Sequence, residues 1–295
     1  MSAAPGRTRR ELVMSGITLG LIALGVLLFV GMFAGILGRG APSLSRERVG
    51  LVEVTGVIAD PDPVTRQLRY FVETARVPVI LLRIDSPGGS VGAAQEIYRQ
   101  VQITRQRGVK VVASMGNVAA SGGYYVAIAA DSIMANPGTL TGSIGVIAEF
   151  PEVDTLLHKL GIGFNVITSG KYKDTGSPFR PMRAADEQLL RGVIRDTYEQ
   201  FVEAVSAARH IPRARLDSLA QGQVMTGRQA KARGLIDTLG NYDDALRLAR
   251  RMGGLGASAR LVRAPAAPKG LLQRLLDGAS GLRHAPNVSV QYLMP

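Results

Sequence analysis

The sequence has 295 residues, 46% of them hydrophobic, with a formal net charge of +12 and no cysteine. This length allows a sizeable core in one large domain or two small ones. The lack of cysteine excludes thiol nucleophiles, disulfides and thiolate metal sites, and the three histidines form no metal-spaced pair. The charge is typical of a nucleic-acid or membrane-surface protein, but no zinc finger or RNA-binding motif is present. We therefore expect no cofactor, no metal and no nucleic-acid partner.

The N-terminal part of the chain predicts a membrane anchor. Residues 12–38 carry no charge, and at about 1.5 Å per residue they can cross a hydrocarbon layer of roughly 30 Å. Basic residues stand just before them, namely Arg7, Arg9 and Arg10, which favours a cytoplasmic N-terminus. A cleaved signal peptide is the alternative, although its apolar core is usually about 7–15 residues long. We expect a cytoplasmic segment (1–11), a single-pass anchor (12–38) and a linker (39–48), with the rest of the chain extracytoplasmic.

From Val49 onward, predicted strands and helices alternate along the chain. Strands are predicted over 49–58, 77–84, 109–114, 132–135, 143–148 and 164–168, and helices over 90–106, 122–130, 184–208 and 227–234. Repeated strand-turn-helix units indicate an α/β fold with mainly parallel strands over residues 49–263. Residues 264–295 depart from this pattern because prolines interrupt them, and they form a basic tail in which only 271–276 is predicted to be helical.

Two glycine-containing turns follow predicted buried strands and open predicted helices. The first is Asp85–Ser90, with Gly88 and Gly89, and the second surrounds Ser121, with Gly122 behind it. A helix N-terminus has unpaired N–H groups, which suit a tetrahedral oxyanion. Because such turns in neighbouring parallel units open on one edge of a sheet, the two can form one site with Ser121 as nucleophile. A serine N-cap in a tightly packed turn is the structural alternative.

A serine in a small-residue turn, with a lysine further along the chain, is the minimum that a Ser-Lys hydrolase requires. The chain has only six lysines, two of which, Lys171 and Lys173, lie in one glycine-bounded loop. Such a base must be neutral, which requires its pKa to fall by about 3 units from ~10.4. Asp174, next to Lys173, opposes this change if its carboxylate lies close. A solvated surface lysine is the alternative for either residue.

Five motifs resemble the signal peptide peptidase A family of serine proteases, in its short, single-copy form. They cover roughly Val49 to Leu246 and comprise Asp85–Ser90, Ala119–Tyr125, Thr139–Val146, Ser169–Asp174 with Ser177–Pro178, and Gly227–Lys231 with Gly234–Asp237. The resemblance implies Ser121 as nucleophile, Lys173 as general base and Ser143 as the serine that hydrogen-bonds the lysine. It also implies that the N–H groups of Gly88 and Gly122 form the oxyanion hole.

The same resemblance implies the fold, the substrates and the assembly. The fold is expected to be ClpP- or crotonase-like, with repeated β-β-α units, and the protein to be a membrane-tethered ring that is an octamer in single-copy members. The expected substrates are remnant signal peptides and other exposed peptides. Two other classes stay open: an acyl-CoA-handling enzyme of the same fold, and a catalytically idle membrane scaffold. We also expect the enzyme to trim its own tail, unless residues 288–294 pair as an ordinary strand that never detaches.

Overall fold

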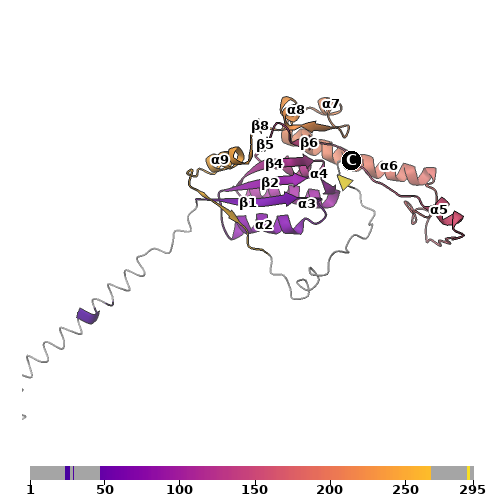
Figure 1. Cartoon of the computed structure of the whole chain (residues 1–295), viewed down its shortest axis with the longest axis horizontal. Coiled ribbons are helices and arrows are strands. Elements are labelled where there is room, and N and C mark those ends of the chain that lie inside the picture. Colours follow the sequence, from indigo (N-terminus) through magenta and orange to yellow (C-terminus); the bar gives the residue numbers. More distant parts are fainter. Residues whose placement is uncertain (1–23, 27–28, 30–46, 267–290, 293–295) are drawn as a thin grey trace, which may run out of the picture. The chain divides into compact units, whose positions relative to one another are not determined.

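The structure is a computed structural model that describes residues 24–26, 29, 47–266 and 291–292 (Figure 1). The predicted anchor, linker and helix over 271–276 therefore lie almost entirely outside the described residues. Of the anchor only 24–26 and 29 are described, and they are helical. Among the described residues, no helix has both the length and the apolar character needed to cross a membrane. The chain divides between residues 46 and 47 into two units, and the fold below is that of the second.

A mainly parallel sheet forms the centre of this unit. Its strands are β1 (Arg48–Thr55), β2 (Val79–Ser86), β4 (Lys110–Ala120), β5 (Ser132–Ala135), β6 (Leu140–Gly142), β7 (Val224–Thr226), β8 (Thr238–Leu239) and β9 (Arg260–Arg263). The order is β7-β6-β4-β2-β1-β9, and β5 joins β4 to β8. Only the β6–β7 pair is antiparallel within this sheet. The predicted α/β class with mainly parallel strands is thus confirmed.

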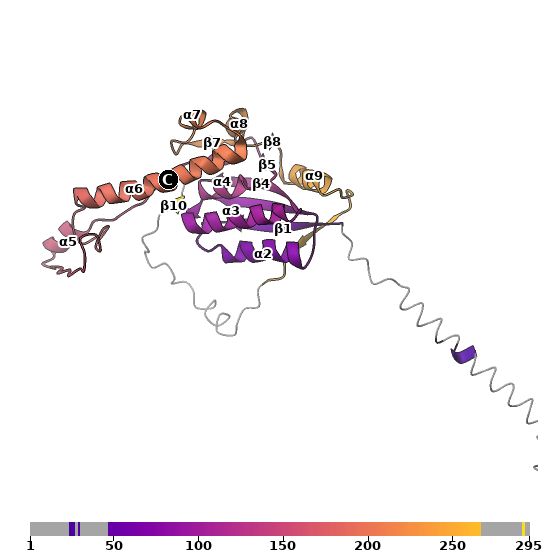
Figure 2. The same ribbon diagram turned by 180° about the vertical axis from the view of Figure 1, so that it is seen from behind.

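Helices cover both faces of the sheet (Figures 1 and 2). One face packs against α2 (Asp62–Glu73), α3 (Val91–Gln106) and α4 (Gly122–Ala127), and the other packs against α9 (Tyr242–Met252). Alternate residues of β2 serve the two cores, with Ile80 and Leu82 on the α2/α3 side and Leu81 on the α9 side. Since every second side chain of a strand faces the same way, continuous apolar runs are what a doubly covered sheet requires.

The central strand β4 changes partner along its length. Its first half pairs with β5 through Val112–Ser114, and its last three residues, Val118–Ala120, pair with β6. The strand is therefore longer than the predicted 109–114, because it continues to the residue before Ser121. This extension brings β6, and Ser143 just after it, alongside the end of β4.

Four further helices complete the unit, namely α5 (Asp154–Lys159), the long α6 (Ala184–Arg209), α7 (Arg213–Leu216) and α8 (Gly227–Ala232). The C-terminal half of α6 packs into the core through Phe201, Val202 and Val205. Residues 146–183, with α5, run out beside the N-terminal half of α6 and form what we call the arm (Figures 1 and 2). The predicted helices over 184–208 and 227–234 are confirmed, and a capping box between Thr226 and Gln229 begins α8.

Two predicted strands are wrong. Residues 164–168 form no strand, and Phe164, Val166 and Ile167 are all strongly exposed, so strand propensity there finds no neighbouring strand to pair with. The strand predicted over 143–148 lies earlier, as β6, because Ser143 has a φ of 49° and turns the chain out of the sheet. Helices α2 and α9 were not predicted.

The last described residues form β10 (Gln291–Tyr292), which pairs antiparallel with β3 (Gly89–Ser90). The pairing places a short piece of the C-terminal tail beside the turn that contains Gly88. The remainder of the predicted strand over 288–294 lies outside the described residues.

The packing of α2 against the sheet depends on one large buried side chain. Phe71 is completely buried, and a Cβ at Gly50 of β1 would lie 2.9 Å from its ring. Phe71→Ala should therefore lower the free energy of unfolding by about 3–5 kcal/mol, through lost burial and the cavity it leaves. Urea unfolding followed by circular dichroism measures this change. The exposed Val57→Ala, as the control, should change it by less than about 0.5 kcal/mol; equal effects would show that Phe71 is not part of a close-packed core.

Candidate active site

The two predicted turns lie side by side at the carboxyl ends of β2 and β4. Ser86 at the end of β2 is in register with Ala119 near the end of β4. The Asp85 carboxylate accepts hydrogen bonds from the N–H of Val118 (3.1 Å) and the amide of Asn117 (3.3 Å). A Cβ at Gly123 would lie 2.8 Å from the carbonyl oxygen of Ser86. The expectation that both turns open on one sheet edge is confirmed.

Ser121 occupies a strained position between β4 and α4. Its φ is 53° and its ψ is −118°, a conformation that costs a non-glycine residue of order 1–3 kcal/mol. Its N–H donates to Gly142 O and its carbonyl accepts from Tyr125 N–H, both at 2.8 Å. The residue is fully buried, yet Ser121 Oγ has no hydrogen-bond partner among the described residues. The fold thus fixes the backbone of Ser121 from both sides and leaves its hydroxyl free.

The helix that follows Ser121 is anchored in the core. The Tyr124 hydroxyl donates to Leu235 O (2.8 Å), and burial raises the pKa of Tyr124 far above its usual range. The Tyr125 ring packs edge-on against Phe201 of α6 (5.0 Å between centroids), and burial raises its pKa to about 12. Both hydroxyls therefore stay neutral, and α4 acts as a fixed support for the serine.

The glycines predicted to donate to an oxyanion flank this serine. Gly122 is the first residue of α4, so its N–H has no intrahelical acceptor. Gly88 has a φ of 112°, and its N–H donates to the hydroxyl of Ser86 at 3.1 Å. A Cβ at Gly89 would lie 2.2 Å from Ile58 O, so this turn admits only glycine there. The Gly88 N–H can donate to an oxyanion once its hydrogen bond to the Ser86 hydroxyl is broken.

Ser143 lies near Ser121, whereas Lys173 does not. Ser143 directly follows Gly142, whose carbonyl accepts from Ser121 N–H, and Ser143 is buried. Lys173 is exposed on the arm, and across residues 47–266 no hydrogen bond or ion pair involves its amine. The structure therefore brings together Ser121, Gly122, Gly88 and Ser143, and it leaves Lys173 apart in this conformation.

An apolar groove opens beside Ser143. It has a volume of about 960 Å³ and runs between residues 143–150 and the N-terminal half of α6. Its walls include Val146, Ile147, Phe150, Leu190 and Ile194. The sequence predicted the helix over 184–208 but not this groove, because helical periodicity does not distinguish a core face from a groove wall.

Comparison with known proteins agrees with this geometry. The model of Peptidase family S49 matches residues 103–255, and the Clp protease model matches residues 50–139. The chain belongs to peptidase family S49. The resemblance to the signal peptide peptidase A family is thereby confirmed, and the Clp protease match agrees with the ClpP-like fold that it implied.

Relatives of this S49 peptidase carry corresponding names. A Synechocystis protein named "Putative protease slr0021" is 41% identical over 241 residues, which cover 81% of this chain and 86% of that protein. An Enterococcus faecium protein named "Putative signal peptide peptidase SppA" is 31% identical and covers 68% of this chain and 62% of its own length. Protease 4 of Haemophilus influenzae is 33% identical over 70% of this chain. The chain spans only 35% of that protein.

The unpaired hydroxyl of Ser121 should make the native residue less stable than its alanine variant. Removing a buried hydroxyl without a partner recovers a desolvation cost of about 1–3 kcal/mol. Ser121→Ala should therefore raise the free energy of unfolding by about 1 kcal/mol, measured by urea titration. Ser114→Ala is the matched control, since Ser114 is also buried but accepts from Arg83 Nη1 at 2.9 Å; it should lower stability. A loss of stability in Ser121→Ala would contradict the structure of this turn.

Proposed function

We propose that the protein is a serine endopeptidase in which Ser121 is the nucleophile and Lys173 the general base. The observation that carries this proposal is the strained backbone of Ser121, held at the end of β4 with its buried hydroxyl unpaired. A neutral lysine amine takes the Ser121 proton as Oγ attacks the peptide carbonyl. The N–H groups of Gly122 and Gly88 stabilise the oxyanion. The lysine then protonates the leaving amine, and water releases the acyl group.

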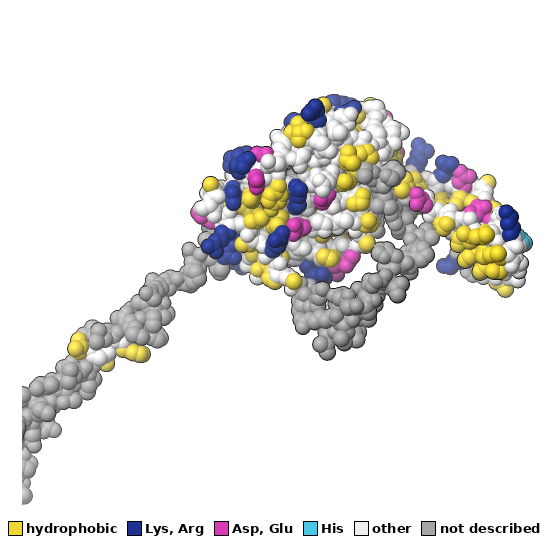
Figure 3. Space-filling view, in the orientation of Figure 1, with side chains coloured by type: hydrophobic (Ala, Val, Ile, Leu, Met, Phe, Trp, Pro, Cys, Tyr) yellow, Lys and Arg dark blue, Asp and Glu magenta, His cyan; other side chains and the backbone are white. Residues whose placement is uncertain are grey.

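The dyad requires Lys173 to reach a serine. The arm that carries it exposes apolar side chains (Figure 3), with at least half of the surface of Leu156, Leu160, Phe164, Val166 and Ile167 accessible. An exposed apolar patch of this kind is typical of an interaction surface. We propose that a second copy of this chain covers it, so that Lys173 of one copy completes the site of its neighbour in a ring. The octameric size of that ring rests on the family resemblance.

Substrate binding is proposed along β3. The edge of β3 accepts β10 as an antiparallel partner, so its backbone groups can pair with an extended peptide. The apolar groove beside Ser143 suits the small and aliphatic side chains of remnant signal peptides. We place the site extracytoplasmically, tethered by residues 12–38, where such peptides remain after secretion.

The alternatives account for fewer of these features. An acyl-CoA-handling enzyme uses paired N–H donors to stabilise an enolate and does not need the Ser121 hydroxyl. An idle scaffold needs neither that hydroxyl nor strain at Ser121, because glycine adopts a positive φ at no steric cost. Labelling of the wild type, but not of Ser121→Ala, by a serine-reactive phosphonate separates the peptidase from both.

Ser121→Ala and Lys173→Ala should each abolish hydrolysis of an apolar reporter peptide, because removing one member of a cooperating pair loses most of its benefit. Lys171→Ala is the matched control and should keep most of the activity, since the Lys171 amine lies over the Tyr172 ring (5.0 Å). If activity survives in Lys173→Ala and disappears in Lys171→Ala, Lys171 is the base and the assignment to Lys173 is wrong.

Mixed rings test whether the base comes from a neighbour. Ser121→Ala and Lys173→Ala subunits, co-expressed with different tags and purified together, should regain activity, because some sites then combine an intact serine with an intact lysine. Mixed rings as inactive as either single variant would place both groups in one chain.

The tail should be a substrate of its own enzyme. Residues 267–290 connect β9 to β10, which lies beside Gly88, so the tail meets the site at high effective concentration. Intact-mass measurement should show C-terminal truncation in the wild type and a full-length Ser121→Ala chain. Equal full-length masses after long incubation would favour a tail that stays paired, and would leave the assignment of the dyad untouched.

A further inference from the structure

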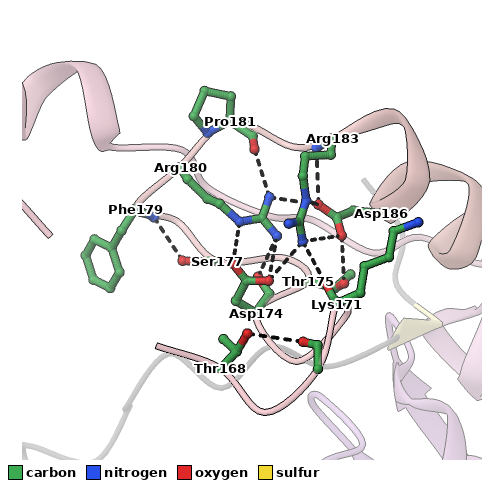
Figure 4. Close-up of polar contacts among 11 residues, drawn as sticks. Thr168, Lys171, Asp174, Thr175, Ser177, Phe179, Arg180, Pro181, Arg183 and Asp186 are labelled. Carbon is green, nitrogen blue, oxygen red and sulfur yellow. Dashed lines mark hydrogen bonds and ion pairs between the residues drawn. The ribbon is translucent and has the colours of Figure 1, made fainter. Parts of the chain in front are cut away.

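Four charged side chains form a closed cluster where the arm meets the N-terminus of α6 (Figure 4). Arg180 holds Asp174 with two parallel bonds, Nε to Oδ2 at 2.6 Å and Nη2 to Oδ1 at 3.0 Å. Its third nitrogen, Nη1, lies 2.7 Å from Asp186. Arg183 bridges the same two carboxylates, at 2.9 Å to each. Two guanidinium groups and two carboxylates thus balance each other in charge.

The cluster is linked to the core of the arm and not only to its surface. The side chain of Asp186 is fully buried in the first turn of α6, and that of Asp174 is 15% exposed. Asp186 also accepts from the hydroxyl of Thr175 at 2.9 Å. Hydrogen bonds to Asp186, the largest effect from Arg183 and a smaller one from Arg180, hold the pKa of Asp186 far below its usual range. Hydrogen bonds from Arg180 lower the pKa of Asp174. Both carboxylates therefore stay ionised and bound.

The bonds of this cluster reach the backbone on both sides of Lys173. On one side, Arg183 Nη2 donates to the carbonyl of Lys171 at 2.9 Å. On the other side, Arg180 Nη2 donates to the carbonyl of Asp174 at 3.1 Å, in addition to binding its carboxylate. Turn hydrogen bonds from Lys173 N–H to Gly170 O and from Ser177 N–H to Asp174 O shape the backbone between them. The backbone around Lys173 is thus fixed, while its amine has no partner among the residues that the structure describes.

Within the described residues, helix α5 supplies no charged group that pairs with the loop around Lys173. The charged groups packed around this loop are Lys171 and Asp174 within it, Arg180 and Arg183 after it, and Asp186 from α6. The loop also contacts the start of α5, where Val153 N–H donates to Pro178 O at 2.8 Å. In the part of the chain that the structure describes, no charged residue of α5 pairs with the loop. Asp174 is therefore the carboxylate best placed to compete for the lysine.

We propose that the Asp174–Arg180–Arg183–Asp186 cluster positions Lys173 and keeps its amine unpaired, by binding the Asp174 carboxylate that would otherwise neutralise it. This inference rests on the proposed role of Lys173 as the base. It answers the objection that an adjacent aspartate favours a protonated lysine. Arg180 and Asp174 are positioning residues, and they do not touch the substrate.

The pH–activity profile tests this role. A neutral base gives an activity that rises with pH through one acidic limb. Arg180→Met removes a positive charge and releases Asp174, so the limb should move to higher pH, by about 0.5–1 unit. Asp174→Asn removes the negative charge, so the limb should move to lower pH. The double variant should return close to the wild-type limb, because the cluster is again neutral.

Two further variants separate charge from geometry. Arg180→Lys keeps the charge but loses the two-bond geometry, so kcat should fall about tenfold or more without a shift of the limb. Arg66→Met is the matched control, since it breaks an exposed arginine–aspartate pair in α2 (3.3 Å) with the same change of charge; its profile should match the wild type. If Arg180→Met does not fold, Arg183→Met takes its place, because Arg183 is 46% exposed and binds the same carboxylates.

The possible outcomes distinguish this inference from the proposed dyad. Unshifted limbs in folded Arg180→Met and Asp174→Asn, with Lys173→Ala inactive, would overturn the role of the cluster and leave the dyad standing. Shifts of both variants in the same direction would also overturn it, since a loosened loop does not distinguish the sign of a charge. Retained activity in Lys173→Ala would overturn the dyad, and the role of the cluster with it.

Discussion

The parallel pairing of β2 with β4 is the constraint on which the rest of the site depends. Because both strands end at one edge of the sheet, the turn after β2 and the turn after β4 must meet there. The Asp85 carboxylate fixes their offset by binding the backbone of Val118, and close contact between Gly123 and Ser86 O leaves no room for a side chain. The serine and both glycine N–H groups therefore follow from one strand register.

Strain at Ser121 persists because its neighbours hold the turn from three directions. β6 receives its N–H, α4 continues from its carbonyl, and the buried Tyr124 ties α4 to Leu235. Each of these contacts lies in the close-packed core, where small shifts are costly. A strained residue whose buried hydroxyl has no partner among the described residues lowers the stability of the protein, which is the exchange of stability for activity that the proposed nucleophile would require.

The sequence was sufficient for the features that depend on local chemistry. Residue patterns along the chain predicted β2, the first half of β4 and the helices α6 and α8. It was insufficient where a tertiary partner decides: residues 164–168 have strand-forming side chains but no neighbouring strand, and β4 runs on to Ala120 only because β6 pairs with it. The sequence also did not predict that Arg180 and Arg183 join Asp174 to Asp186, because these contacts depend on how the arm folds back onto α6.

The proposed nucleophile and the proposed base are held in place by different interactions. Ser121 lies in an apolar core, where packing fixes a strained backbone, whereas Lys173 lies on an exposed arm with little apolar burial, where charged hydrogen bonds must provide the order. Bidentate arginine–carboxylate pairs suit that task because their planar geometry fixes orientation as well as distance. Such a loop can keep its shape while the arm as a whole moves or docks. In the proposed dyad, Lys173 meets a serine that its own chain does not bring within reach, and activity then requires the arm to dock onto a second copy.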